Sequence, residues 1–409
     1  MIATYPRIAL VAEHHPAFAK SFGTPNLIKT LCSAPNFQFA AIVAADVAGP
    51  DPVPGPWDSV PTLSLFRPRS LLPNLSIGLG RLDNLFFRWQ RNRVTHFLAK
   101  QHIDRLFVLI ANNARFAQLA ARLPRSIPTD IYIVDDFVED SHLYHVNRQA
   151  ARQSLETLLA ASDRVFAISP VYAADLQAQY RRPCQFLPLP IPDSTLKTAR
   201  PVQPKSVESN EIVIHHSGQV HHLYADALAR FIVLLSQLSR STPKKFKLEL
   251  WGNLSRASLE RSLQLDLREV QTDSFSIDLY NAASRTALIA EQQRADFLLL
   301  VNSFLPAFEK QVRCSFSSKT SEYLVSGTPI LIYAPTYSSL VAYLGQHNAA
   351  CIVSAEDSDE ALAALNKVFS NIGTRGVVDA ALKLAHTHHS LDAVFKQIVT
   401  PKLGGEVTA

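Results

Sequence analysis

One short stretch of this chain combines two serines, a lysine and a glutamate at a spacing that suits phosphate and sugar chemistry. Ser317, Ser318 and Lys319 follow an apolar run at 297–301 that indicates a buried strand, and Glu322 lies one helical turn further on. Either serine can cap the helix that starts there. Such a helix start offers free backbone N–H groups, so a phosphate is the expected ligand. Glu322 can accept hydrogen bonds from the vicinal hydroxyls of a sugar.

The residues that follow predict the end of this helix and a second strand. Gly327 can adopt the left-handed conformation that ends a helix, and Pro329 prevents the helix from continuing. The apolar run 330–333 then indicates another buried strand. The stretch is therefore a strand–helix–strand unit of a parallel sheet.

This unit resembles the donor-binding motif of the retaining, group-one glycosyltransferases. The matching segments are Ser317-Ser318-Lys319, Glu322-Tyr323-Leu324 and Gly327-Thr328-Pro329. The resemblance implies that the helix start holds the diphosphate of a nucleotide sugar and that Glu322 binds its ribose. The family usually has a second glutamate eight positions earlier, where this chain has Cys314. The alternative is a plain helix whose early glutamate suits the helix dipole.

Other candidate donor-binding residues lie in the turn that opens the second half of the chain and before the motif. The turn contains Gly218, Gln219, His221 and His222. In the resembling family it carries an arginine and a lysine that grip the diphosphate, and this chain has neither there. The histidines can donate to a phosphate, whose charge favours imidazolium. Arg313 is a further candidate cation. The alternative is that these are ordinary surface side chains.

Two more glycine-containing loops follow predicted strands, and both are expected to contact the donor. Gly252 ends the strand-like run 247–251, at a place comparable to the family's loop near the nucleotide base. Gly23 stands in the loop after the first strand, where the family usually has paired glycines. Thr24 is expected to cap the next helix, with Pro25 at its first position.

A pair of carboxylates supplies the candidate catalytic residues. Asp135 and Asp136 end the strand-like run 131–134, and the carboxyl end of a parallel strand is where a ligand is expected. In the resembling family a histidine followed by an acidic residue often stands here, near the reacting sugar. Asp136 is the first candidate and Asp135 the second, to orient an acceptor hydroxyl or to support positive charge on the sugar. The alternative is that both cap the next helix.

A basic segment at residues 81–100 predicts a helix whose role has two interpretations. Its apolar residues recur at helical spacing: Leu82, Leu85, Phe86 and Trp89. It carries five basic residues against Asp83 alone: Arg81, Arg88, Arg91, Arg93 and Lys100. One interpretation is a helix that contacts an anionic membrane or an anionic acceptor. The other is a core helix with a solvated basic edge.

Composition limits the class of protein. The chain has 409 residues, 47% hydrophobic and 18% charged, with a formal charge of +5. These values fit two globular domains, and a modest charge gives no reason to expect a nucleic-acid partner. We expect no bilayer-spanning segment and no signal peptide. Four widely spaced cysteines indicate reduced thiols in a cytoplasmic protein and no zinc site: Cys32, Cys184, Cys314 and Cys351.

Apolar runs alternate with helical stretches in both halves of the chain, which predicts parallel sheets covered by helices. In the first half the runs are 8–12, 39–44, 106–110, 131–134, 164–168 and 185–189. We expect an N-terminal acceptor-side domain at 1–193, a linker at 194–210, a donor-binding domain at 211–385, and a C-terminal helix and tail at 386–409 that returns to the N-terminal domain. Residues 49–80 are expected to form a long irregular connection.

The apolar runs predict an α/β protein, and the resemblance implies GT-B architecture, with two Rossmann-like domains whose parallel sheets face each other across a cleft. The function that the resemblance implies is transfer of a sugar from a UDP- or GDP-linked donor to a glycan or lipid-linked acceptor, in polysaccharide or glycoconjugate synthesis. Retention of configuration is implied by the resemblance. We expect no metal or cofactor, and a cytoplasmic location with peripheral contact at the inner membrane surface. The alternatives are a non-catalytic nucleotide- or glycan-binding protein and a sugar-nucleotide epimerase. No G-x-G-x-x-G follows a predicted strand, which argues against a dehydrogenase.

Overall fold

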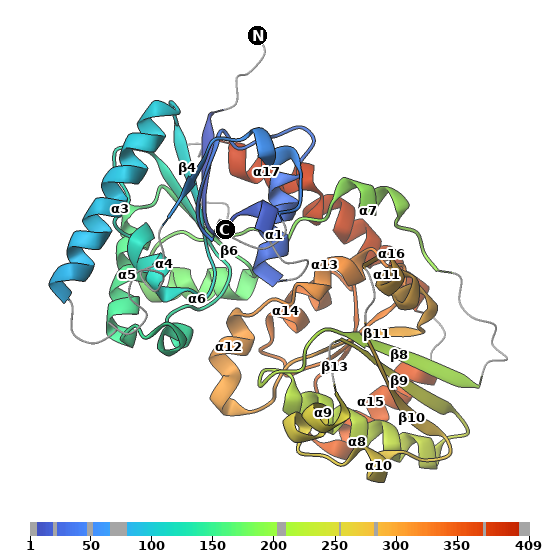
Figure 1. Ribbon diagram of the computed structural model, residues 1–409. Coiled ribbons are helices and arrows are strands. Elements are labelled where there is room, and N and C mark those ends of the chain that lie inside the picture. The colour runs from blue at the N-terminus through green and yellow to red at the C-terminus, as the bar shows by residue number, and fades with distance from the viewer. Residues whose placement is uncertain are drawn as a thin grey trace. The chain divides into compact units, whose positions relative to one another are not determined.

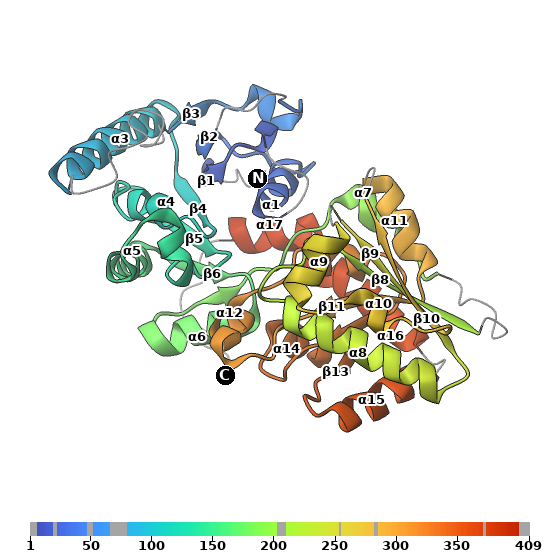
Figure 2. The same ribbon diagram turned by 60° about the horizontal axis from the view of Figure 1, so that its bottom comes forward.

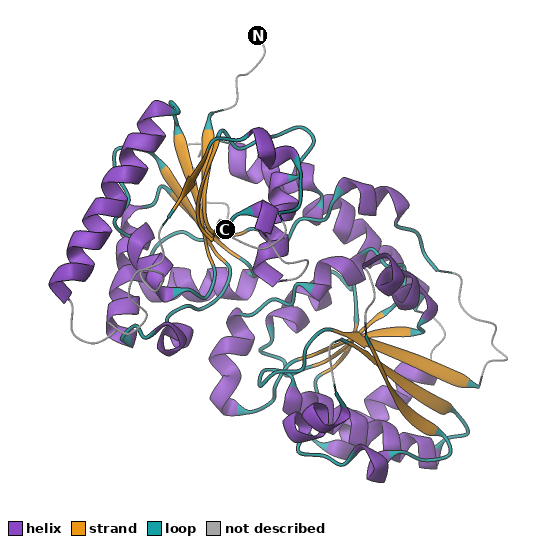
Figure 3. Cartoon of the chain, in the orientation of Figure 1, coloured by secondary structure: helices purple, strands orange, loops and turns teal. Residues whose placement is uncertain are grey.

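The computed structural model in Figure 1 describes residues 6–18, 23–46, 52–65, 80–202, 210–252, 255–281, 285–370 and 374–400. The chain divides into two compact units. One consists of Met1–Pro192 with Ser390–Ala409, and the other of Asp193–His389. Each unit is a parallel sheet covered by helices, coloured by secondary structure in Figure 3.

The first unit contains a seven-stranded sheet in the order β3-β2-β1-β4-β5-β6-β7, with every pairing parallel. Its strands are β1 (Ile8–His14), β2 (Ala41–Asp46), β3 (Thr62–Ser64), β4 (Arg105–Ile110), β5 (Thr129–Ile133), β6 (Arg164–Ala167) and β7 (Gln185–Phe186). Residues 8–12 are all buried because helices cover both faces of the sheet, so the strand appears in the sequence as a continuous apolar run.

Helices lie on both faces of this sheet, with α3, α4 and α5 on one side and α1 and α17 on the other (Figures 1 and 2). The helices of this unit are η1 (Pro16–Phe18), α1 (Gly23–Cys32), η2 (Pro56–Ser59), α3 (Gly80–Lys100), α4 (Ala114–Ala120), η3 (Glu139–Tyr144), α5 (Arg148–Ala161), α6 (Pro170–Tyr180) and α17 (Leu391–Val399).

The C-terminal helix α17 is fixed to the first unit by a buried charge network. Asp130 is fully buried and accepts hydrogen bonds from Arg105 Nη1 and Arg164 Nε, both at 3.0 Å. The other N–H groups of Arg164 donate to carbonyl oxygens at the end of α17, those of Gln397, Ile398 and Thr400. The guanidinium thus satisfies carbonyls that a helix end leaves without partners, and Phe395 stacks on Phe37.

The second unit contains a six-stranded parallel sheet in the order β10-β9-β8-β11-β12-β13. Its strands are β8 (Glu211–Ser217), β9 (Lys245–Trp251), β10 (Phe275–Tyr280), β11 (Phe297–Val301), β12 (Ile330–Tyr333) and β13 (Cys351–Val353). Its helices are α7 (Asp193–Thr198), α8 (Ala225–Ser241), α9 (Arg256–Leu263), α10 (Leu267–Val270), α11 (Arg285–Arg294), η4 (Pro306–Phe308), α12 (Glu309–Cys314), α13 (Lys319–Leu324), α14 (Ser339–Gln346), α15 (Ser358–Ser370), α16 (Arg375–Leu384) and the π-helix η5 (Ala385–His389).

The largest apolar cluster of this unit lies between the sheet and helices α8, α9, α10 and α15, which share one face (Figures 1 and 2). Strand β9 shows why: Phe246, Leu248 and Leu250 point to this face and are buried. The alternate residues Lys247 and Glu249 form an ion pair at 3.1 Å on the other face.

Three parts of the chain differ from the sequence prediction. The proline-rich connection at 49–80 contains η2 and the edge strand β3, and residues 66–79 lie outside the described residues. Strand β10 was not predicted, because its apolar residues alternate with polar ones. The segment 194–210, predicted to be a linker, begins at the second residue of helix α7, and its residues 203–209 lie outside the described residues. Residues 401–409 of the predicted tail also lie outside them.

Candidate functional site

The strand order of the second unit reverses direction between β8 and β11. Connections run outward from this pair in both directions, and open parallel sheets bind ligands at the carboxyl ends of such strands. Gly218 follows β8 directly and has a φ of 104°, in the region that favours glycine. Its N–H donates to the carbonyl oxygen of Trp251 at the end of β9, at 2.7 Å. The turn is therefore held at the carboxyl ends of β8 and β9.

Lys319 lies against this turn. A Cβ atom added to Gly218 would be 2.6 Å from Lys319 Cε and 3.2 Å from Nζ, so the lysine occupies the space that a side chain at 218 would need. Nζ also lies 4.7 Å from the centre of the Tyr224 ring, a cation–π contact. Within the described part of the chain it has no hydrogen-bond or ion-pair partner. Burial lowers the pKa of Lys319 to about 8, against the opposing effect of Glu322.

Two histidines, His216 and His221, lie close enough to Lys319 for its charge to affect them. His216 on β8 is buried, and one ring nitrogen lies 3.0 Å from the carbonyl oxygen of Leu299. Burial lowers its pKa, and the Lys319 charge lowers it further. Desolvation and the same charge lower the pKa of His221 to about 4. Both rings are therefore neutral at pH 7, and Lys319 carries the positive charge of the group.

Tyr323 connects the motif helix α13 to the end of β8. Its hydroxyl accepts a hydrogen bond from Ser217 N at 3.1 Å and lies 3.0 Å from Ser217 Oγ. The tyrosine side chain is fully buried. The residue after Ser217 is Gly218, so this contact sets the position of Lys319 relative to the glycine turn. Sequence reasoning did not assign a role to Tyr323.

The helix start differs from the prediction in two respects. Helix α13 has only six residues, and the Ser318 side chain makes no capping hydrogen bond. The predicted serine cap is therefore wrong for Ser318, which is exposed, while Ser317 is buried. A dipole summed over so short a helix is small, so the charge of Lys319 is the stronger attraction for an anion. The prediction that Gly327 is left-handed is confirmed, with a φ of 79°.

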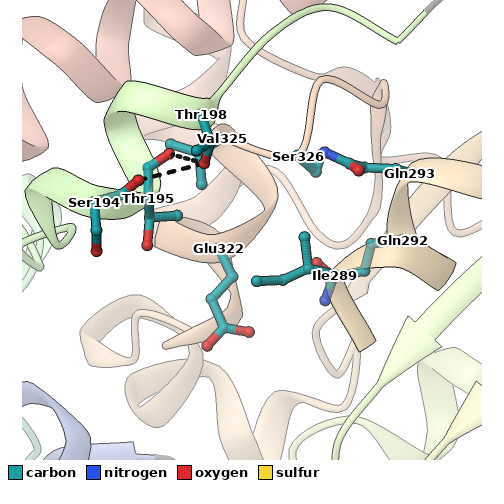
Figure 4. A pocket seen from close by; sticks show the side chains of 9 residues that line it. All are labelled: Ser194, Thr195, Thr198, Ile289, Gln292, Gln293, Glu322, Val325 and Ser326. Carbon is teal, nitrogen blue, oxygen red and sulfur yellow. Dashed lines mark hydrogen bonds between the residues drawn. The ribbon is translucent and has the colours of Figure 1, made fainter. Parts of the chain in front are cut away.

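Glu322 lines a polar pocket of about 150 Å³ together with residues of α7 and α11 (Figure 4). The other lining residues are Ser194, Thr195, Thr198, Ile289, Gln292, Gln293, Val325 and Ser326. Figure 4 shows the Glu322 carboxylate and the Gln292 amide extending from α13 and α11 into the same space. Cys314, in place of the family's first glutamate, is buried at the end of α12.

The remaining predicted donor residues occupy two places. Gly252 follows β9, and its N–H donates to the carbonyl oxygen of Tyr280, next to a stacked pair of Trp251 and Tyr280 rings 4.6 Å apart. Gln219 and His222 are exposed in the turn after β8. Arg313 is half-buried on α12, where its carbonyl oxygen accepts a hydrogen bond from Ser339 on α14.

In the first unit the two aspartates have different environments. Asp136 is buried, and its Oδ1 accepts hydrogen bonds from Val138 N at 3.1 Å and Glu139 N at 3.4 Å, at the start of η3. This is the capping role that sequence analysis left open. Asp135 is half-buried. Burial, with the charges of Asp140 and Asp136, raises its pKa to about 6.

The strand order of the first unit reverses between β1 and β4, and a buried glutamate joins the two strand ends. Glu13 accepts hydrogen bonds from Ala111 N at 3.0 Å and Asn113 N at 3.3 Å. Helix α1 begins at Gly23, so Thr24 lies within its first turn and the prediction that Thr24 caps this helix is wrong. Glu13 was not singled out from the sequence, because an isolated acidic residue at a strand end has no distinctive pattern.

Helix α3 confirms the helix predicted over the basic segment and leaves an apolar patch on its outer face. Leu85 is 61% and Trp89 46% exposed, while Gln90, Val94 and Leu98 are buried. The exposed residues beside the patch include Arg88 and Arg91, and the Arg93 guanidinium lies 4.9 Å from the Trp89 ring centre. Side chains 81–84 lie outside the described residues. Of the helices that the structure describes, none has the length and apolar character to span a bilayer.

Comparisons with known proteins place the fold. No family model and no curated protein matches the sequence. Solved structures match over nearly the whole chain. A lipopolysaccharide outer core galactosyltransferase, WaaB, has a TM-score of 0.63 at 14% identity, covering 96% of this chain and 97% of its own. A sucrose-phosphate synthase from Thermosynechococcus elongatus has a TM-score of 0.64 at 16% identity, covering 96% of each chain.

A third structure, Anabaena HepE in complex with UDP, has a TM-score of 0.65 at 13% identity, covering 96% of this chain and 98% of its own. At these identities the similarity concerns the fold. The expected fold class is confirmed in its two parallel-sheet α/β domains, one with seven strands and one with six. The chain has the fold of the GT-B glycosyltransferases.

Proposed function

We propose that this protein is a glycosyltransferase that moves a sugar from a UDP- or GDP-linked donor to a glycan or lipid-linked acceptor. The observation that carries the proposal is the position of Lys319 against the Gly218 turn, at the switch point of the second sheet. The sequence lacks the basic residues that the resembling family has in this turn. Lys319 supplies a cation at the same turn from a different part of the chain.

The chemistry required of the second unit is stabilisation of a departing diphosphate. Negative charge develops on the leaving oxygen as the bond to the sugar breaks, and a fixed cation near that oxygen lowers the barrier. Lys319 fits this role because its ammonium is half-buried and has no carboxylate partner among the described residues. His221 and His222 can add N–H donors from the turn.

We assign the acceptor side to the first unit, with Asp135 as its reactive carboxylate. The bond between the sugar C1 and the diphosphate oxygen breaks, and the acceptor oxygen forms the new bond to C1. The hydroxyl proton must leave at the same time, and Asp135 can accept it. Its pKa of about 6 makes it a stronger base than an ordinary aspartate while keeping it mostly ionised at pH 7. We propose retention of configuration, which requires the acceptor oxygen to attack C1 from the face that the diphosphate leaves.

The test begins with donor binding. Melting temperatures are measured with UDP, GDP, ADP and CMP at millimolar concentration, because a ligand that binds only the native state raises its stability. We expect UDP or GDP to stabilise the protein and Glu322→Ala to weaken that effect, since Glu322 is assigned to the ribose. If none of the four nucleotides stabilises the parent, the donor site is refuted.

A second candidate is a nucleotide-binding protein that catalyses no transfer. The burial of Cys314, where the family has a glutamate, favours this reading. Incubation with the stabilising nucleotide's sugar conjugates and a panel of glycan acceptors separates the two. Product formation establishes a transferase, whereas tight binding without transfer to any acceptor establishes the second candidate.

We also propose that α3 docks on an anionic membrane, where a lipid-linked acceptor is available. Leu85 and Trp89 can enter the interfacial region while each flanking arginine gains about 1 kcal/mol near anionic lipid. Vesicle sedimentation tests this with the parent and with a variant carrying Leu85→Ser and Trp89→Ser. We expect salt-sensitive binding to anionic vesicles, weakened in the variant. Equal sedimentation of both proteins would show that α3 is a helix with a solvated basic edge.

A further inference from the structure

The pocket beside Glu322 contains a buried amide that has no role in the fold. Gln292, on α11, is 1% exposed, and within the described part of the chain neither its side-chain oxygen nor its nitrogen has a protein hydrogen-bond partner. Burying such a group without partners costs about 1–3 kcal/mol. The backbone of Gln292 is engaged, because its carbonyl oxygen accepts a hydrogen bond from Thr328 Oγ1 at 2.9 Å. The side chain therefore stands on a firmly held helix.

Two of the four hydroxyl groups that line the pocket are already used within the protein. Thr198 Oγ1 donates to backbone carbonyls of its own helix, and Ser326 Oγ donates to the Tyr323 carbonyl oxygen at 2.8 Å and accepts from Thr328 N. These groups fix the walls of the pocket. The amide of Gln292 remains available to a ligand, and it lines the same pocket as the Glu322 carboxylate (Figure 4).

We propose that Gln292 and Glu322 together bind the two vicinal hydroxyls of a ribose, so that the pocket selects ribonucleotides. This inference rests on the proposed function. Each sugar hydroxyl is at once a donor and an acceptor. A carboxylate can only accept, whereas the amide NH₂ can donate, so the pair can satisfy both halves of each hydroxyl. A pocket of about 150 Å³ is large enough for one sugar ring.

The position of Gln292 also explains why a glutamine is found there at all. A leucine or methionine at 292 would remove two buried atoms that have no hydrogen-bond partner among the described residues. A residue that weakens the fold and faces a ligand pocket is expected where function requires it. Replacement by an apolar residue should therefore leave stability unchanged or improved and should weaken binding.

The experiment uses the full chain and the diphosphate that the parent binds, UDP or GDP, with its 2′,3′-dideoxy analogue as the second probe. Dissociation constants for both are measured by calorimetry for the parent, for Gln292→Met and for Gln292→Asn. Gln237→Met, at an exposed glutamine on α8, is the matched control. The Asn variant keeps an amide but withdraws it from the pocket by one methylene group, so it tests the inference if the Met variant fails to fold.

We expect the parent to bind the ribonucleotide more tightly than the dideoxy analogue. Both Gln292 variants should weaken ribonucleotide binding about 5- to 20-fold and leave the analogue unchanged, while the Gln237 control matches the parent. A Gln292→Met melting temperature at or above that of the parent is also expected.

Unchanged ribonucleotide affinity in Gln292→Met would overturn the inference and leave the proposed function standing. An equal loss for both probes would overturn it as well, because the amide would then act on the fold or on another part of the ligand. A parent that binds no nucleoside diphosphate would refute the proposed function, and this inference with it.

Discussion

Lys319→Met is the change that most directly tests the proposed donor site. The substitution removes the ammonium and keeps an unbranched side chain of similar length next to Gly218, where the lysine stem now lies. The charge has no ion-pair partner among the described residues, and burial has already lowered its pKa to about 8. Removing it should therefore leave the fold as stable as before, or more stable.

The expected effect on binding follows from the loss of one charge-assisted hydrogen bond to the diphosphate. Such a bond contributes roughly 1.5–3 kcal/mol. Since about 1.4 kcal/mol corresponds to a factor of ten, the dissociation constant for UDP or GDP should rise about 10- to 100-fold. Lys319→Arg keeps the charge but is bulkier against the glycine turn, so we expect a smaller loss.

Calorimetric titration at pH 7 measures these affinities, and thermal unfolding without ligand measures the fold. Lys383→Met is the matched control, since Lys383 is exposed on α16 of the same unit and its loss changes the net charge equally. Equal nucleotide affinity for the parent and Lys319→Met would refute the reasoning. So would an equal loss in the Lys383 control, which would indicate a diffuse electrostatic effect.

Three further predictions follow from the same geometry. Asp135→Asn should lower turnover at least 100-fold and leave donor affinity unchanged. Asp136→Asn should lower turnover less, because the amide oxygen can still cap η3. Steady-state kinetics with calorimetry measures both quantities, and a larger loss of turnover in Asp136→Asn would mean that Asp136 is the base. Turnover should rise with pH through about 6, as Asp135 loses its proton, and donor affinity should fall above about pH 8, as Lys319 loses its own; a flat profile from pH 5 to 9 contradicts both assignments. Gly327→Ala should destabilise the fold by more than about 2 kcal/mol in chemical denaturation. Residue 327 has a positive φ, and the added Cβ would lie 1.9 Å from the Arg200 carbonyl oxygen. An unchanged denaturation midpoint would mean that the backbone around Arg200 can move away from the added methyl group at no cost.

The sequence by itself determined the sheets and the motif. Strands buried on both faces leave continuous apolar runs, so the strands at 8–12, 106–110 and 297–301 could be located without a structure. The positive φ of Gly327 could also be predicted from the sequence, because a glycine two residues before a proline is typical of a helix end. Strand β10 was missed because one of its faces carries polar residues, which produces the alternation of a half-exposed strand.

Only the tertiary structure decided which chemical groups meet. Lys319 and Gly218 are far apart in the chain and come together because β8 and β11 are neighbours in the sheet, which no local pattern encodes. The sequence analysis ranked Asp136 above Asp135, and our proposal reverses that order. The reason is visible only in the fold, where backbone N–H groups at the start of η3 bind the Asp136 carboxylate, while burial and neighbouring charges raise the pKa of Asp135. Gln292 shows the same limit: its amide is a plain polar residue in the sequence, and burial on a pocket wall makes it a candidate ligand-binding group.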